Sequence, residues 1–322
     1  MNITVIGCGR WGSFIAWYLN SIGKDVALYG RENSSNFKRF KETGENDYIK
    51  IPESLKLSSD LNVVKNSQIV VISVGAQNFR GLLKELKDLE IKDKKIVLCM
   101  KGIEIDSKKR LSQVAKEILD PSNKVAVWIG PGHVQEFYRG VPNCMVIDSE
   151  EEELKKYLVD EFSSSLIRFY YGTDLIGNEL GAATKNVIGI AAGALDGLGL
   201  SSLKGALMSR GTREVSRLIE AMGGNPFSAY GLCHLGDYEA TVFSEFSHNR
   251  KFGESLVKNE KFKSLAEGYY TVKAIIGLKE DYKVDMPITQ AVYNVCYESK
   301  DPRHELESLF LRSLKDEFTQ ER

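Results

Sequence analysis

Near its start the chain reads Ile3-Thr4-Val5-Ile6-Gly7-Cys8-Gly9-Arg10-Trp11-Gly12, an apolar run followed at once by a GxGxxG turn. The run predicts a buried strand, and the helix-like segment 13–20 follows the turn. In this context Gly7 permits a tight turn, Gly9 lets the backbone approach a pyrophosphate, and Gly12 lets the helix pack close to the sheet. Free amides at the helix start would face the anion. The stretch predicts a Rossmann-type dinucleotide site; a glycine turn that binds nothing is the alternative.

Strand-like and helix-like segments alternate after this turn. Apolar runs, most of them rich in Val and Ile, predict strands at 3–6, 25–29, 68–74, 95–100, 124–129, 144–147 and 166–170. Apolar residues three and four apart predict helices at 14–22, 79–89, 108–119 and 151–162. This alternation is typical of an α/β doubly wound fold with a mostly parallel sheet.

The pattern changes after Gly172. From there on helical spacing dominates, for example at 214–222 and 306–318. We therefore expect a dinucleotide-binding Rossmann domain at residues 1–172 and an all-helical, substrate-binding and catalytic domain at 173–322. The polar stretch 31–50 is expected to be a surface insertion whose charges are solvated.

Composition excludes several classes of function. The 322 residues are 43% hydrophobic and 27% charged, and a net charge of -1 gives no global field that would attract nucleic acid or an anionic membrane. No apolar run approaches the ~20 residues of a membrane span, and no signal peptide is evident, so a cytoplasmic protein is expected. Five scattered cysteines without CxxC spacing, and four histidines without ligand spacing, predict reduced thiols and no metal site.

Lys185 is a candidate acid or base. It stands alone in Gly181-Ala182-Ala183-Thr184-Lys185-Asn186-Val187-Ile188-Gly189-Ile190-Ala191-Ala192-Gly193, which has no acidic residue before Asp196. Burial disfavours the ammonium form, so its pKa should fall from ~10.4 toward ~7 to 8. A lysine whose stem packs on the helix and whose tip reaches water is the alternative.

The end of the second strand bears on cofactor choice. It reads Leu28-Tyr29-Gly30-Arg31, without the acidic residue that usually holds the ribose hydroxyls of NAD. Arg31 suits a 2′-phosphate, whereas the adjacent Glu32 could still accept a ribose hydroxyl. NADP or NAD is therefore expected, with NADP slightly favoured.

Further motifs follow in order along the chain: Met100-Lys101-Gly102-Ile103-Glu104, Ile129-Gly130-Pro131-Gly132-His133, Leu235-Gly236-Asp237 with Thr241, Ser247-His248-Asn249-Arg250-Lys251-Phe252-Gly253, Ala266-Glu267-Gly268 and Met286-Pro287-Ile288. With them, nearly the whole chain resembles the bacterial-type NAD(P)-dependent glycerol-3-phosphate dehydrogenases. The resemblance makes Lys185 the catalytic proton donor and acceptor. It implies substrate contacts at Lys101, Gly130, Gly132, Asn186, Asp237, Thr241, Ser247, His248 and Asn249. With the glycine turn and Arg31, the expected cofactor contacts are Gly7, Gly9, Arg10, Trp11, Gly12, Arg31, Lys101, Val134, His248, Leu265 and Glu267.

The implied reaction is reversible hydride transfer between NAD(P)H and dihydroxyacetone phosphate, giving sn-glycerol 3-phosphate for phospholipid synthesis. Lys101 would attract the phosphorylated substrate and lower the pKa of Lys185 by like-charge repulsion. Asp237 would oppose that shift if it approached Lys185. Its expected task is to orient the lysine or accept a substrate hydroxyl, and a helix cap is the alternative.

The chain departs from the family pattern in its pocket. His248 stands where arginine is usual and should grip a phosphate less firmly, a loss for which Arg250 could compensate. Gly132 replaces a serine or threonine, which we expect to enlarge the pocket. Cys233 and His234 replace small residues and are expected to pack or shape the pocket, not to act as a nucleophilic pair.

These departures keep alternatives open. The substrate could be another small phosphorylated or carboxylated ketone, reduced by another enzyme of the same two-domain superfamily. A dinucleotide sensor without chemistry is a further alternative, although Lys185, Lys101 and Asp237 are all present. A homodimer is possible, because the apolar positions 306, 309, 310 and 314 suit either an intrachain core or a subunit interface.

Overall fold

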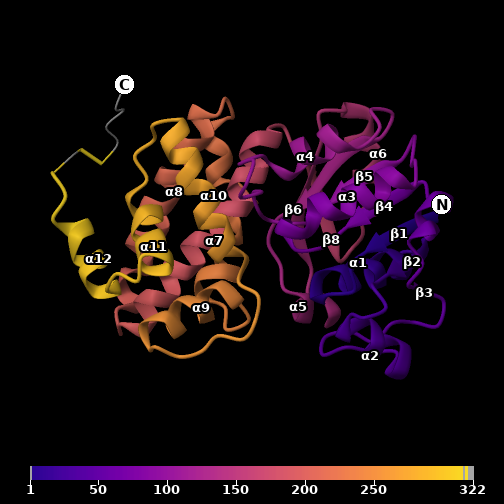
Figure 1. The fold of residues 1–322 in the computed structure, drawn as a ribbon, viewed down its shortest axis with the longest axis horizontal. Helices are drawn as coiled ribbons and strands as arrows, with labels where there is room; N and C mark the ends of the chain where they lie inside the picture. The colour runs from indigo at the N-terminus through magenta and orange to yellow at the C-terminus, as the bar shows by residue number, and fades with distance from the viewer. Residues whose placement is uncertain (1, 315, 318–322) are drawn as a thin grey trace.

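The computed structural model describes residues 2–314, 316 and 317 of the chain. Strands and their flanking helices form one half of the molecule, and helices alone form the other (Figure 1). The sheet ends at Tyr171, and the long helix α7 (Leu175–Gly197) begins directly afterwards. The fold is thus the expected α/β doubly wound, Rossmann-type unit followed by helices.

The described residues form one eight-stranded sheet of order β3-β2-β1-β4-β5-β6-β7-β8. All neighbouring strands pair in parallel except β6 and β7, which are antiparallel. The strands are β1 (Asn2–Ile6), β2 (Asp25–Tyr29), β3 (Lys56–Ser58), β4 (Ile69–Ile72), β5 (Lys95–Leu98), β6 (Lys124–Ile129), β7 (Asn143–Asp148) and β8 (Ile167–Tyr171). Only β3 was missed, because a three-residue edge strand carries no apolar run.

Helices cover both faces of this sheet. Apolar side chains of α1, α2, α5 and α6 pack on one face, and those of α3 and α4 pack on the other. These helices are α1 (Arg10–Ser21), α2 (Ser35–Thr43), α3 (Phe79–Asp88), α4 (Leu111–Ile118), α5 (Val134–Tyr138) and α6 (Glu152–Phe162). The polar stretch 31–50 is more than a solvated insertion, because α2 within it buries Phe37 and Phe40 against the sheet.

In the helical half, α7 is the central element, and α8 to α11 pack against it. The helices that follow α7 are α8 (Lys204–Ala221), α9 (His248–Val257), α10 (Glu267–Asp281), α11 (Pro287–Tyr297) and α12 (Pro302–Phe310). Short 3₁₀ helices lie at Leu61–Asn66, Ala76–Asn78, Ser201–Leu203, Pro226–Tyr230 and Leu235–Asp237, and a π-helical turn lies at Glu239–Phe243.

Glycines let α7 and α9 approach closely. A Cβ on Gly193 of α7 would lie 1.8 Å from the Arg250 carbonyl oxygen of α9, and a Cβ on Gly253 of α9 would lie 2.0 Å from the Ile190 carbonyl oxygen. Such distances are possible only without side chains. The small residues around Lys185 therefore serve helix packing, and the same packing buries the lysine.

The helix expected at 306–318 is wrong in its extent, because α12 ends at Phe310. Leu309 packs on the core of the helical half, but Phe310 is 67% exposed and Leu314 is fully exposed. Residues 315 and 318 of the expected helix lie outside the described residues. Leu311 and Leu314 are exposed, so burial of their side chains does not stabilise a further helical turn.

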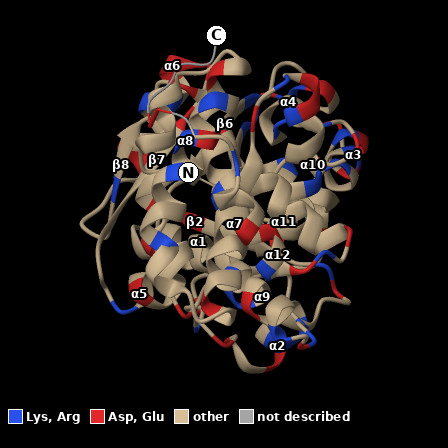
Figure 2. Cartoon of the chain, turned by 90° about the vertical axis from the view of Figure 1, so that its left-hand side faces the viewer, with Lys and Arg blue, Asp and Glu red and all other residues tan. Residues whose placement is uncertain are grey.

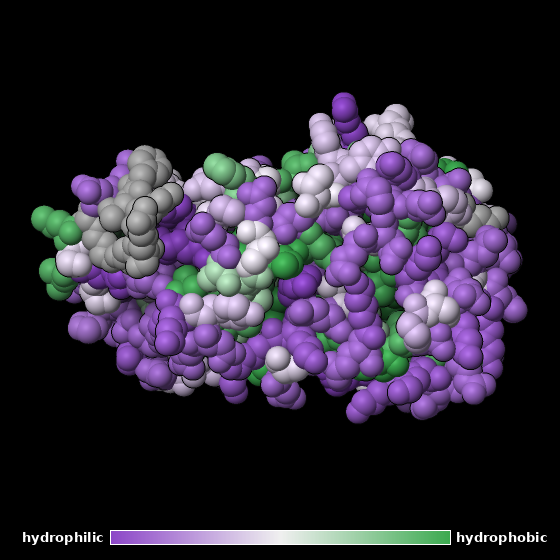
Figure 3. Space-filling view, turned by 90° about the horizontal axis from the view of Figure 1, so that it is seen from above, coloured by the Kyte–Doolittle hydropathy of each residue, from purple (hydrophilic) through white to green (hydrophobic). Residues whose placement is uncertain are grey.

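The surface carries both signs of charge. Lys and Arg are interspersed with Asp and Glu on the face shown in Figure 2. Figure 3 shows a largely hydrophilic exterior, with hydrophobic residues standing out at the end where α12 lies. Among residues 2–314, 316 and 317, no helix combines the length and apolar character that a membrane span requires.

Candidate active site

The glycine-rich turn, the end of β2 and the start of α10 surround a cavity of about 550 Å³. The expected cofactor contacts that line it are Gly7, Gly9, Arg10, Trp11, Gly12, Arg31, Leu265 and Glu267. The others, Lys101, Val134 and His248, do not line it. Segments more than 200 residues apart in the sequence therefore meet around one cavity.

The three turn glycines occupy the environments that their predicted roles require. Gly7 has φ +114°, and a Cβ there would lie 2.1 Å from the Ser73 carbonyl oxygen. A Cβ on Gly12 would lie 1.9 Å from the Gly7 carbonyl oxygen, so the start of α1 packs tightly on the turn. A Cβ on Gly9 would meet no atom within 4 Å. The backbone at Gly9 is thus open toward the cavity, as an approaching pyrophosphate needs.

Arg31 lies at the end of the cavity beside β2. Its guanidinium Nη2 donates to Glu85 Oε1 at 2.9 Å, and both side chains are largely exposed. An exposed pair of this kind contributes little free energy, so an incoming phosphate can replace Glu85 at small cost. Glu32 is exposed and does not line the cavity.

Glu267, the first residue of α10, closes the cavity from the helical half. Burial raises the pKa of its carboxyl, although a hydrogen bond from the backbone of Ala76 opposes the shift. Glu267 therefore joins the two halves of the molecule where the cavity lies.

Helix α7, which carries Lys185, is held in position by polar contacts in its first turns. Glu179 of α7 accepts hydrogen bonds from the Ser112 backbone N–H at 2.9 Å and the Ser112 hydroxyl at 2.6 Å, and it also pairs with Arg110. All three side chains are buried. These contacts tie the start of α7 to the N-terminus of α4, so the position of Lys185 is set relative to the sheet.

Lys185 is buried and lies beside a carboxylate. Its Nζ donates to Thr241 Oγ1 at 2.7 Å and lies 3.1 Å from Asp237 Oδ2. Burial lowers the pKa of Lys185 to about 8, with Asp237 opposing the shift and Lys101 and Arg10 adding to it. The lowered pKa and the directions of the Asp237 and Lys101 effects are those that the sequence predicts.

Asp237 joins two lysines from opposite halves. Its Oδ2 accepts from Lys101 Nζ at 2.6 Å as well as facing Lys185, and Lys101 also donates to the Gly130 carbonyl oxygen at 2.6 Å. Asp237 is fully buried, and its Oδ1 has no hydrogen-bond partner among the described residues. The carboxylate orients the lysines and does not cap a helix.

The side-chain amides of Asn186 and Asn249 form a hydrogen-bonded chain that starts at Lys101. Asn186 Nδ2 donates to the Lys101 carbonyl oxygen at 3.1 Å, and Asn186 Oδ1 accepts from Asn249 Nδ2 at 3.0 Å. Asn249 Oδ1 in turn accepts from the Gly268 N–H at 2.9 Å. Both asparagines are thereby held in fixed orientations, linking α7, α9 and α10 to the end of β5.

Ser247 and His248 stand at the start of α9. The Ser247 hydroxyl caps the helix by accepting from the Arg250 N–H at 3.3 Å. The His248 ring Nδ1 lies 3.3 Å from the Leu265 carbonyl oxygen. Burial, with Arg10 nearby, lowers the pKa of His248, so the ring is neutral at neutral pH.

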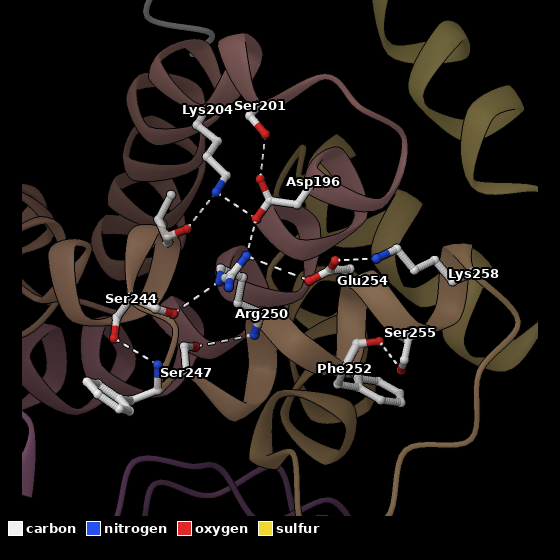
Figure 4. A network of polar contacts seen from close by, with 12 residues as sticks. Asp196, Ser201, Lys204, Ser244, Ser247, Arg250, Phe252, Glu254, Ser255 and Lys258 are labelled. Carbon is white, nitrogen blue, oxygen red and sulfur yellow. Dashed lines mark hydrogen bonds and ion pairs between the residues drawn. The ribbon is translucent and has the colours of Figure 1, made fainter.

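Arg250, the cation that could compensate for His248, is engaged by other partners. Its guanidinium pairs with Asp196 at 2.5 Å and donates to the Ser244 carbonyl oxygen at 3.1 Å (Figure 4). Asp196 also binds Lys204 at 2.7 Å, so Arg250 belongs to a separate structural network between α7, α8 and α9.

The expected enlargement of the pocket at Gly132 is also wrong. Gly132 has φ +145°, and a Cβ there would lie 2.2 Å from the Phe137 ring. The buried Phe137 occupies the space that a serine or threonine side chain would need.

Cys233 and His234 pack as expected. Ring atom Nδ1 of His234 lies 2.9 Å from the Gly181 carbonyl oxygen, and Nε2 lies 2.6 Å from the Tyr238 hydroxyl. Burial lowers the pKa of His234 to about 4 and raises that of Cys233. The thiol therefore stays protonated at neutral pH, and the pair has no nucleophilic thiolate.

Sequence reasoning missed His133 as a site residue. Its ring lies close enough to Lys185, Arg10, Asp237 and Lys101 for their charges to act on its pKa. Its position directly after the Gly130–Gly132 turn was the available signal.

A phosphate-cradling turn on a doubly wound sheet, faced by a helical half that carries a buried lysine of lowered pKa, is typical of the two-domain nucleotide-dependent dehydrogenases. The comparisons are more specific. The family model described as NAD-dependent glycerol-3-phosphate dehydrogenase N-terminus matches residues 2–155, and the corresponding C-terminus model matches residues 174–307. The chain belongs to the NAD-dependent glycerol-3-phosphate dehydrogenase family.

Individual relatives agree with this assignment. The chain is 36% identical over 330 residues to a glycerol-3-phosphate dehydrogenase (NAD(P)+) of Thermoanaerobacter sp., covering 99% of each protein. It is 37% identical over 336 residues to one of Clostridium botulinum, covering 98% of this chain and 99% of the relative. The crystal structure of glycerol-3-phosphate dehydrogenase from Coxiella burnetii superposes with a TM-score of 0.91 at 29% identity, covering 97% of this chain and 99% of that one.

Proposed function

We propose that this chain is an NAD(P)-dependent sn-glycerol-3-phosphate dehydrogenase that reversibly reduces dihydroxyacetone phosphate. The observation that carries the proposal is the buried Lys185, held by Asp237 and Thr241, with its pKa lowered to about 8. The bound nicotinamide supplies or accepts the hydride.

Lys185 moves the proton. In reduction its ammonium donates to the developing alkoxide, and in oxidation its neutral amine takes the hydroxyl proton. A pKa of about 8 keeps both forms accessible near neutral pH. Lys101 adds a positive charge that attracts a phosphorylated substrate. Hydrogen bonds to Lys101 and Asn249 fix the Asn186 side chain in a position to orient the substrate.

NADP is favoured over NAD in this proposal. Arg31 lies at the β2 end of the cavity, and its present partner Glu85 is an exposed carboxylate. Glu32, the residue that could hold a ribose hydroxyl of NAD, lies outside the cavity lining.

A second candidate is a reductase of another small phosphorylated or carboxylated ketone. It is favoured by the neutral His248 and by the commitment of Arg250 to Asp196, which leave fewer cations for a phosphate. A substrate panel separates the two. NADPH and NADH oxidation should be fastest with dihydroxyacetone phosphate; if that ketone is inert while another turns over, the substrate assignment fails.

The lysine is tested separately. Lys185→Ala should lower kcat by a factor on the order of 100 or more, because the proton donor is lost, while cofactor affinity changes little. Stopped assays with dihydroxyacetone phosphate and a fluorescence titration with NADPH measure the two quantities. An unchanged kcat removes Lys185 from the mechanism.

Other features belong to the same proposal. We place the domain division at residues 1–172 and 173–322, next to the end of β8. A cytoplasmic location, supply of glycerol 3-phosphate for phospholipid synthesis and a homodimer rest on the family resemblance. The exposed Phe310 and Leu314 at the end of the helical half are compatible with a subunit interface.

A further inference from the structure

His133 stands where the two halves of the molecule meet. It follows the turn at the end of β6 and occupies the position before the first residue of α5. Its ring lies edge-on to that of Phe246, with 5.6 Å between centroids, and the Phe246 carbonyl oxygen accepts from Arg10 Nη1 at 3.3 Å. His133 is thus fixed between a strand end of the sheet half and the loop before α9.

Two polar atoms at this site are buried without a partner. They are Nε2 of His133 and Oδ1 of Asp237, neither of which has a hydrogen-bond partner among the described residues. A buried polar atom left unpaired is destabilising, and such atoms in a site point to a ligand. Each atom is therefore available for a hydrogen bond to a ligand that binds between the two halves.

The charges around His133 define its state. Burial lowers its pKa to about 4, and the cations Lys185, Arg10 and Lys101 act in the same direction while Asp237 opposes them. The ring is neutral at neutral pH, and in the tautomer that carries the proton on Nε2 it offers one hydrogen-bond donor. It is neither a proton source for the alkoxide nor a cationic phosphate ligand.

A hydroxyl group has the hydrogen-bonding character that both unpaired atoms need. Oδ1 of Asp237 can only accept, and Nε2–H of His133 can donate, whereas a hydroxyl both donates and accepts. A phosphate would be repelled by the Asp237 carboxylate, and the carbonyl oxygen of the ketone is assigned to the Lys185 ammonium. An uncharged hydroxyl next to the reacting carbon meets both requirements.

We propose that His133 is a specificity-determining residue, whose Nε2 donates to the terminal hydroxyl of the ketone substrate while Asp237 Oδ1 accepts from that hydroxyl. The inference rests on the proposed function, since dihydroxyacetone phosphate carries such a hydroxyl next to its carbonyl. His133 thereby distinguishes hydroxymethyl ketones from methyl ketones.

The test compares two substrates that differ by this group alone. Acetol phosphate has a methyl group where dihydroxyacetone phosphate has a hydroxymethyl group. His133→Phe should lower kcat/KM for dihydroxyacetone phosphate at least tenfold and change that for acetol phosphate less than threefold, so the preference between them collapses. His133→Gln, whose amide reaches the position of Nε2, should retain most of the preference.

Controls separate this role from a structural one. His304→Phe makes the same chemical change on the exposed face of α12 and should leave both kcat/KM values unchanged. If His133→Phe lowers kcat/KM equally for the two ketones, His133 only packs. If a fluorescence titration shows a raised NADPH dissociation constant for this variant, His133 contacts the cofactor. Either result overturns the inference. A wild-type chain that does not reduce dihydroxyacetone phosphate overturns the proposed function instead. If wild type reduces it and His133→Phe keeps the preference, only the inference on His133 fails.

Discussion

The carboxylate of Asp237 should set the pH at which the enzyme loses its proton donor. Its Oδ2 lies 3.1 Å from Lys185 Nζ, and both groups are buried. Two unit charges at that distance interact by about 5 kcal/mol at an effective dielectric constant of about 20. Asp237→Asn removes this attraction, and the pKa of Lys185 should fall below its present value of about 8.

The observable shift will be smaller than the full Coulomb energy. An asparagine keeps a dipole toward the lysine, and water can enter to solvate the ammonium. We expect a fall of at least about one pKa unit, which corresponds to about 1.4 kcal/mol. Because ketone reduction needs the ammonium, its rate is full below the pKa of Lys185 and is lost as the pH rises through that value. The variant should therefore lose activity at lower pH than the wild type.

The assay is the pH profile of kcat/KM for dihydroxyacetone phosphate reduction, followed by NADPH oxidation above pH ~6.5, where the substrate phosphate is largely ionised. Asp196→Asn is the matched control, since Asp196 also joins two cations, Lys204 and Arg250, but lies in a separate network. It should leave the alkaline limb in place. An alkaline limb that stays or moves upward in Asp237→Asn, with activity still measurable, would refute the assigned electrostatic role.

Two further substitutions probe the cavity and the turn after β6. Arg31→Ala should lower the ratio of kcat/KM for NADPH to that for NADH at least tenfold, because a phosphate contact is lost. Glu85→Ala should preserve or raise this ratio. A wild-type NADH preference unaffected by Arg31→Ala would contradict the role of Arg31 in binding the 2′-phosphate. Gly132→Ser forces a Cβ within 2.2 Å of Phe137 and should cost about 2–4 kcal/mol, lowering Tm by at least about 5 °C in a calorimetric scan. Gly140→Ser, also at positive φ but with open space around it, should lower Tm clearly less, and equal shifts would show that the clash is not the cause.

Local patterns were sufficient for the fold class. The GxGxxG turn between β1 and α1, and the change to helical spacing after Gly172, are both visible as short-range periodicity. The three-residue β3 and the end of α12 at Phe310 were not visible, because an edge strand and a helix end depend on what lies beside them.

The sequence by itself predicted burial and a lowered pKa for Lys185, since the stretch 181–193 around it holds no other charged residue. Only the tertiary structure decided which groups meet it. Asp237 reaches two lysines from opposite halves, Phe137 fills the space beside Gly132, and Arg250 pairs with Asp196 away from the site. Contacts between segments tens to hundreds of residues apart depend on packing between helices and sheet, which no local spacing encodes. For the same reason the unpaired nitrogen of His133 became visible only once the two halves were seen together.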